Sequence, residues 1–296
     1  MNDQAERLRV RLGLKEKKNG KKAIAVVSGK GGVGKSNFSL NFAIALSKLG
    51  SKVMVIDMDI GMGNLDILMG SAPDFTIVDY FEKEIPLEKI IMAGPDGVHY
   101  IAGGSGLASF VKLEEAKLDQ FFEDLETSFK DYDYLIFDMG AGIRKDLLPF
   151  ILSVDEVFVL TTPESTAITD AYAMIKYIHI LDSKIPLYVV VNKARSVKDG
   201  TETMQRLSKV VNQFLGRCLI SLGILPDDLT VQTAVRRQIP FVNLNEKSPV
   251  SRTLKEMADR YVKQKAFETT PAVKFHFVAK LKKFLFERKG GRYGEN

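Results

Sequence analysis

Short runs of consecutive apolar residues alternate along the chain with longer segments whose apolar residues recur every three or four positions. The short runs predict strands buried on both faces, and the longer pattern predicts amphipathic helices that cover them. The alternation of the two predicts an α/β domain with a doubly wound, mostly parallel sheet flanked by helices. Strands are expected at 23–27, 52–57, 99–102, 134–138, 157–160, 187–191 and 219–225, helices at 37–49, 112–130 and 165–181, and a helix with a loop at 76–96.

The composition fits one domain with a basic extension at each end. Of the 296 residues 45% are apolar, which is enough for a sizeable core. The net charge is +5, but residues 1–22 and 274–296 each carry +5, so the chain between them carries −5. We therefore expect an N-terminal motif and linker at 1–22, the domain at 23–268, an amphipathic helix at 271–289 and a flexible tail at 290–296. The acidic domain argues against direct nucleic-acid binding.

The sequence favours a cytoplasmic protein. It shows no secretory leader and no apolar run long enough to span a bilayer. Cys218 is the single cysteine, and its apolar neighbours Leu219 and Ile220 predict a buried thiol. His99 and His179 have no partners at metal-ligand spacing, so zinc chemistry is not expected.

Residues 29–36 have the spacing G-x-x-x-x-G-K-S between a predicted strand and a predicted helix, which is typical of a phosphate-binding loop. In such a loop backbone N–H groups surround the phosphates, Lys35 reaches the β- and γ-phosphates, and the Ser36 hydroxyl binds Mg²⁺. The predicted nucleotide-binding residues here are Gly31, Gly32, Val33, Gly34, Lys35, Ser36 and Asn37.

Acidic residues stand where two predicted strands end. Asp57 and Asp59 follow the second strand, and Asp138 ends the strand at 134–138. The carboxyl ends of parallel strands lie beside the phosphate loop, where carboxylates can support Mg²⁺ or orient an attacking water. We assign Ser36, Asp57 and Asp138 to the metal and Asp59 to the water.

The C-terminal segment from 271 predicts a basic amphipathic helix. Its apolar arc and border hold Phe275, Phe277, Val278, Leu281, Phe284 and Leu285, and lysines lie on the other side. Such a helix is suited to a membrane interface that contains anionic lipids. The alternative is a last core helix, and the same face could serve both roles at different times.

The N-terminal segment predicts a short helix that Asn2 or Asp3 could cap, with Ala5, Leu8 and Leu12 on one face. Taken alone, it is either a frayed terminus or a peptide that folds on binding a partner.

Lys30 extends the loop pattern to K-G-G-x-G-K-S/T, which resembles the deviant phosphate loop of the MinD/ParA family of ATPases. The resemblance covers roughly residues 22–265. It implies slow ATP hydrolysis with Mg²⁺ by a homodimer, in which Lys30 contacts the nucleotide across the dimer and acts with Lys35 and Asp59. Asn192 matches the family position that contacts adenine, and Pro226 and Asp227 lie in the matching base-side loop.

Within that family the N-terminus resembles the D-Q-A-x-x-L-R motif of FlhG, the flagellar-number regulators also called YlxH or FleN. The matching residues are Asp3, Gln4, Ala5, Leu8 and Arg9. The resemblance implies that they stimulate FlhF, an SRP-type GTPase, and that the protein is peripheral on the inner face of the cell membrane when ATP-bound. Flagellar switch-complex proteins are further candidate partners. Gly63 and Gly140 also depart from MinD, which has Arg and Pro there.

Three other functions compete with this interpretation. A MinD-type division-site ATPase shares the loop and the C-terminal helix but lacks the 22-residue basic extension. A ParA-type DNA-segregation ATPase would need a basic domain face, which the charge of the domain opposes. A metabolic P-loop enzyme of the dethiobiotin-synthase type would need a substrate motif, and we find none.

Overall fold

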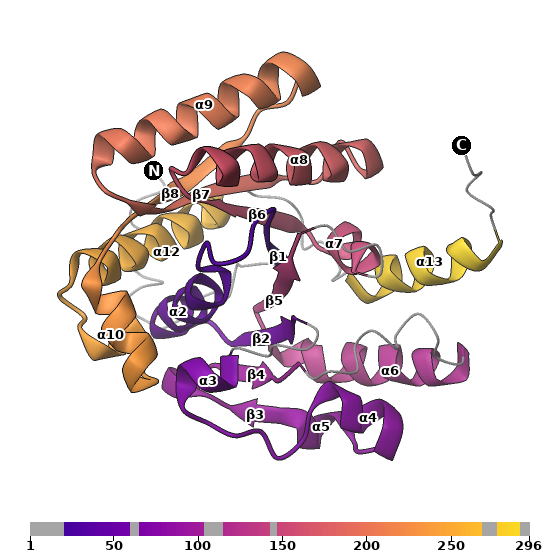
Figure 1. Cartoon of the computed structure of the whole chain (residues 1–296). Helices are drawn as coiled ribbons and strands as arrows, with labels where there is room; N and C mark the ends of the chain where they lie inside the picture. The colour runs from indigo at the N-terminus through magenta and orange to yellow at the C-terminus, as the bar shows by residue number, and fades with distance from the viewer. Residues whose placement is uncertain (1–20, 60–64, 104–114, 143–146, 268–276, 291–296) are drawn as a thin grey trace, which may run out of the picture.

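The computed structural model describes residues 21–59, 65–103, 115–142, 147–267 and 277–290, and a twisted eight-stranded sheet forms their centre (Figure 1). Its spatial order is β3-β4-β2-β5-β1-β6-β7-β8, and neighbours pair in parallel except β3 with β4. The predicted α/β class is confirmed. The strands are β1 (Lys22–Ser28), β2 (Val53–Met58), β3 (Ile91–Ala93), β4 (His99–Ile101), β5 (Tyr134–Ala141), β6 (Glu156–Thr161), β7 (Leu187–Ala194) and β8 (Ile220–Pro226).

Helices cover both faces of the sheet (Figure 1). One apolar core lies under α2 (Lys35–Lys48), α3 (Leu65–Met69), α10 (Leu229–Arg237), α11 (Phe241–Leu244) and α12 (Pro249–Phe267). The other lies under α4 (Ile77–Lys83), α5 (Leu87–Ile90), α6 (Glu115–Ser128), α7 (Leu148–Ser153), α8 (Ser165–Leu181), α9 (Val197–Leu215) and α13 (Phe277–Gly290). Short 3₁₀ turns occupy Pro95–Gly97 and Phe129–Asp131.

Strand β1 shows why the central strands carry apolar residues on both faces. Ala23, Ala25 and Val27 enter the core under α13, whereas Ile24 and Val26 enter the core under α2. Successive side chains of a strand point to opposite faces, so a strand between two helical layers needs apolar residues throughout.

Two local expectations differ from the structure. Residues 76–96 contain strand β3 as well as helices, because a three-residue strand is too short to show a period. Cys218 is exposed rather than buried. The chain leaves α9 at Gly216 with φ 60°, and Arg217 is buried instead, where its guanidinium donates to the carbonyl oxygens of Asp182 and Ile185.

The C-terminal helix α13 packs on the domain beside α7 and α6. Phe277, Val278 and Leu281 are buried, and the Phe277 ring lies 4.7 Å from that of Phe137 in β5. Its Lys280 ammonium lies 3.9 Å from the carboxylate of Asp155, at the start of β6. These three residues of the apolar arc predicted from the sequence thus belong to the core under α13. No helix among the described residues is long and apolar enough to cross a membrane.

Candidate functional site

The phosphate loop joins the end of β1 to the start of α2 at the carboxyl edge of the sheet. Gly32 and Gly34 have φ of 77° and 95°, in the left-handed region where glycine carries no Cβ penalty. Gly34 caps α2 without a side-chain hydrogen bond, so the first amides of the helix face the loop. Lys35 is buried in that first turn. This strand–loop–helix geometry binds anions through backbone amides and the helix dipole.

Gly29 is required by the packing of α8 on the loop. A Cβ added there would lie 2.1 Å from the backbone oxygen of Asp170 in α8. At Gly31 the nearest atom to an added Cβ is the Ala141 side chain, at 3.8 Å. The two glycines therefore have different roles, one in packing and one in the open part of the loop.

The acids predicted for the metal lie side by side. Asp57 and Asp138 are register partners on β2 and β5, and both are buried. Ser39 donates to Oδ1 of Asp138 over 3.1 Å, while Oδ2 is buried without a hydrogen-bond partner. Burial raises the pKa of Asp138, and the Lys35 charge and the Ser36 and Ser39 hydroxyls oppose part of the rise.

These residues fit Mg²⁺. The unpartnered Oδ2 of Asp138 is a buried oxygen that a hydrated cation would satisfy, and the Asp57 carboxylate lies beside it. The described residues contain no cluster of three or more His, Cys, Asp or Glu side chains that could hold a metal alone. One or two carboxylates completed by waters and phosphate oxygens are how proteins usually hold Mg²⁺.

Asp59 directly follows β2 and is half-buried. Its backbone N–H donates to Oδ1 of Asp57 over 2.9 Å, which fixes the turn after the strand. A Cβ added at Gly140 would lie 3.2 Å from Oδ1 of Asp59, so this carboxylate lies against the end of β5. Gly142 donates to the Ser28 carbonyl and joins that segment to the end of β1. The predicted water-orienting acid thus lies against the β5 segment that bonds to the end of β1.

Lys30 is engaged within its own chain. Its ammonium lies 2.7 Å from Oε2 of Glu164 and 3.0 Å from the Thr166 hydroxyl, at the start of α8. The Lys30 ammonium lowers the pKa of the Glu164 carboxyl. The sequence did not predict Glu164 and Thr166 as partners of Lys30. The available signal was an acidic residue, Glu164, directly before the predicted helix at 165–181.

Two consecutive residues of β7 also contact the phosphate loop. Nδ2 of Asn192 donates to the Val33 carbonyl and Nζ of Lys193 to the Gly32 carbonyl, each over 2.8 Å. Asn192 was predicted as a base contact, and Lys193 was not predicted at all. Asn37 is half-buried, and its carbonyl accepts from Nδ2 of Asn41 within α2.

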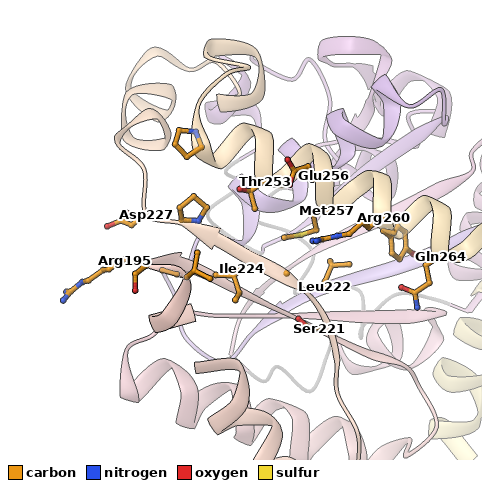
Figure 2. Close-up of a pocket in the computed structure, with 17 residues that line it drawn as sticks. Arg195, Ser221, Leu222, Ile224, Asp227, Thr253, Glu256, Met257, Arg260 and Gln264 are labelled. Atoms are coloured by element: carbon orange, nitrogen blue, oxygen red, sulfur yellow. The ribbon is translucent and has the colours of Figure 1, made fainter. Parts of the chain in front are cut away.

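Pro226 and Asp227 line a cavity of about 820 Å³ between β8, α12 and the turn after β7 (Figure 2). Its lining includes no residue of the phosphate loop, so the cavity is separate from that loop. The Asp227 amide donates to the Ala194 carbonyl and fixes this loop against β7.

Some predicted residues lie outside this description. The motif residues Asp3, Gln4, Ala5, Leu8 and Arg9, and Phe275 before α13, are outside the described residues, and the side chain of Leu285 is not described. Phe284 is half-buried on the docked helix.

Gly29→Ala should destabilise the fold by about 2 kcal/mol or more, because the added methyl group meets backbone rather than a movable side chain. Gly31→Ala, the matched control, should stay within about 0.5 kcal/mol of wild type, since its methyl group has room. Urea unfolding without nucleotide measures both. Equal loss in the two variants would contradict the packing role of Gly29.

Comparison with known proteins agrees with the fold and the loop. The model of the ParA family described as NUBPL iron-transfer P-loop NTPase matches residues 19–262. The antiactivator FleN of Pseudomonas aeruginosa is 36% identical over 80% of this chain and 85% of its own length. The flagellum site-determining protein YlxH of Helicobacter pylori is 38% identical over 80% of this chain and 83% of its own.

Among solved structures, the cell-division ATPase MinD of Pyrococcus furiosus matches with a TM-score of 0.67 and 25% identity. The match covers 82% of this chain and 99% of that protein. The chain therefore belongs to the MinD/ParA family of P-loop ATPases, in the branch that contains FleN and YlxH.

Proposed function

We propose that this chain is an ATP-driven switch that regulates the number and placement of flagella. The names of the relatives YlxH and FleN, a flagellum site-determining protein and an antiactivator, support a flagellar role. The D-Q-A-x-x-L-R motif before the domain favours it over a MinD-type role in division, and the acidic domain favours it over DNA segregation.

The observation that carries the switch is the position of β5. Its Asp138 points toward the nucleotide side and bonds Ser39 of α2, while the adjacent Phe137 packs on Phe277 of the docked helix. Helix α7, which also contacts α13, follows the same strand in the chain. If nucleotide binding moves the end of β5, the movement would occur next to the residues on which α13 packs. This arrangement supports coupling between nucleotide state and helix release.

In this proposal the phosphates occupy the amide cradle of residues 31–36, with Lys35 against the β- and γ-phosphates. Ser36, Asp57 and Asp138 would hold Mg²⁺, the carboxylates through its waters, and the ion would neutralise phosphate charge. Asp59, which lies against Gly140, would orient the attacking water.

Dimer formation is proposed to exchange the partner of Lys30. In the single chain its ammonium is bound by Glu164 and Thr166, at a site where its side chain is 39% exposed. An exposed pair of this kind is weak, so the lysine can leave it for a phosphate of the second subunit. ATP would thereby favour a dimer that ADP does not.

Lys30→Ala should keep ADP binding, because Lys35 and the loop amides remain, and should lose the ATP-dependent dimer. Asp59→Ala should hydrolyse ATP about a hundredfold more slowly and accumulate as a dimer. Light scattering with ATP and with ADP measures the mass of each variant. A Lys30→Ala dimer at the wild-type level would contradict the role across subunits, and a monomeric Asp59→Ala protein in saturating ATP would contradict the role of Asp59.

We propose that α13 is a membrane anchor that stays docked on the domain until nucleotide binding releases it. Phe277, Val278 and Leu281 need an apolar environment, which the core supplies in the docked state and a bilayer would supply after release. Lys280, Lys282 and Lys283 would then face anionic headgroups on the inner face of the cell membrane.

Phe284→Glu should abolish flotation of the full chain with anionic vesicles in ATP, since this half-buried side chain would have to enter lipid. Ala279→Glu on the exposed side of the same helix carries the same charge change and should retain most binding. Equal flotation in ADP and ATP would contradict nucleotide-coupled release. Unchanged flotation after truncation at residue 270 would contradict the anchor itself.

The N-terminal motif is proposed to activate FlhF. A peptide of residues 1–22 should accelerate GTP hydrolysis by FlhF, and the same peptide with Gln4→Ala and Leu8→Ala should not. The absence of acceleration by the wild-type peptide would contradict this partner and leave the ATPase switch standing. Flagellar switch-complex proteins remain proposed partners, and direct nucleic-acid binding is not expected.

A further inference from the structure

Asn192 and Lys193 of β7 together form what we term the loop clamp, two side chains that bind successive carbonyls of the phosphate loop. Nδ2 of Asn192 lies 2.8 Å from the Val33 oxygen, and Nζ of Lys193 lies 2.8 Å from the Gly32 oxygen. Oδ1 of Asn192 in turn accepts the backbone N–H of Lys193 over 2.9 Å, which joins the two clamp residues.

The backbone of β7 is irregular where the clamp begins. Lys193 has φ 56°, an uncommon conformation for a residue with a Cβ, and the register between β7 and β8 shifts between Val191 and Ala194. In a regular strand adjacent side chains point to opposite faces and cannot both reach one loop. The left-handed residue interrupts that alternation, and both side chains contact the same two-residue segment.

The clamp sets the direction of the amides that follow those carbonyls. In a planar trans peptide the C=O of one residue and the N–H of the next point in opposite directions. Binding the Gly32 carbonyl toward β7 turns the Val33 N–H the other way, and binding the Val33 carbonyl does the same for the Gly34 N–H. A cluster of like-directed N–H groups is what an anion-binding loop supplies.

We propose that Lys193 is a positioning residue for nucleotide binding: through the Gly32 carbonyl it fixes the Val33 amide in the phosphate cradle, as Asn192 does for the Gly34 amide. The proposal rests on the phosphate loop being the nucleotide site. The clamp and the loop are also in close contact at Gly34, where an added Cβ would lie 2.5 Å from Nδ2 of Asn192.

Three variants of Lys193 separate its ammonium from its backbone. Lys193→Met removes the donor and keeps the left-handed strain, Lys193→Gly removes both, and Lys193→Arg keeps a donor. Lys193→Met and Lys193→Gly should each bind MgADP on the order of tenfold more weakly, because each loses one hydrogen bond from a charged donor. Lys193→Arg should recover most of the affinity for MgADP. Lys184→Met, at an exposed lysine between α8 and β7, is the matched control and should bind like wild type.

Hydrogen exchange of individual amides distinguishes a local change in the loop from a change in overall stability. The Val33 and Gly34 amides should exchange faster in Lys193→Met and Lys193→Gly, while the melting temperature of Lys193→Gly stays at or above that of wild type. Adenosine, which lacks phosphates, should bind all variants equally.

Wild-type MgADP affinity in both Lys193→Met and Lys193→Gly would overturn the proposal, as would unchanged exchange at Val33 and Gly34. A loss confined to Lys193→Met would also overturn it, because Lys193→Gly lacks the same ammonium. Lys35→Ala separates the two levels of inference. If it loses MgADP while the Lys193 variants do not, the clamp role fails and the nucleotide site stands; if it binds normally, the nucleotide site itself fails.

Discussion

Parallel pairing of β1, β5 and β2 brings the phosphate loop and the acidic residues to one edge of the sheet. Val26 of β1 and Asp57 of β2 are both register partners of Asp138 in β5, which lies between them. Parallel strands require crossover connections, and α2 makes the first of these with its N-terminus at the same edge. The backbone amides of the phosphate loop and the carboxylates of Asp57 and Asp138 thus meet without any local sequence linking them. The contacts of α8 and β7 with the phosphate loop lie at the same edge.

The buried carboxylate of Asp138 lowers the stability of the fold, and nothing in the packing requires a charge there. Asp138 is buried with one oxygen unpartnered, and burial of its carboxylate raises its pKa. Lys35 and the serine hydroxyls of α2 offset part of this cost, and a hydrated Mg²⁺ would offset more. Stability lost in this way is expected where a site is built for a ligand rather than for the apo fold.

Strand β5 faces two environments with different chemistry. Its side toward α2 carries Asp138, the carboxylate proposed for Mg²⁺, and its other side carries Phe137 under the C-terminal helix. Protein interiors are packed as densely as crystals and therefore transmit small displacements. A displacement of β5 caused by a bound nucleotide could thus reach α13 without any contact between α13 and the nucleotide. In the proposed switch α13 would present its apolar side either to the core or to lipid, so its location would depend on the stability of the docked state rather than on its own sequence alone.

The sequence by itself determined the class of fold, the phosphate loop and the acids at the strand ends. Runs of consecutive apolar residues, apolar residues that recur every three or four positions, and fixed spacing around glycines are local signals that need no partner to be recognised. The tertiary structure decided what depends on distant segments: the Glu164 partner of Lys30, the contact of Lys193 with Gly32, the exposure of Cys218 and the docking of α13. Each of these features depends on contacts between residues far apart in the chain or on a single backbone angle. Neither long-range contacts nor single backbone angles produce a periodic pattern in the sequence.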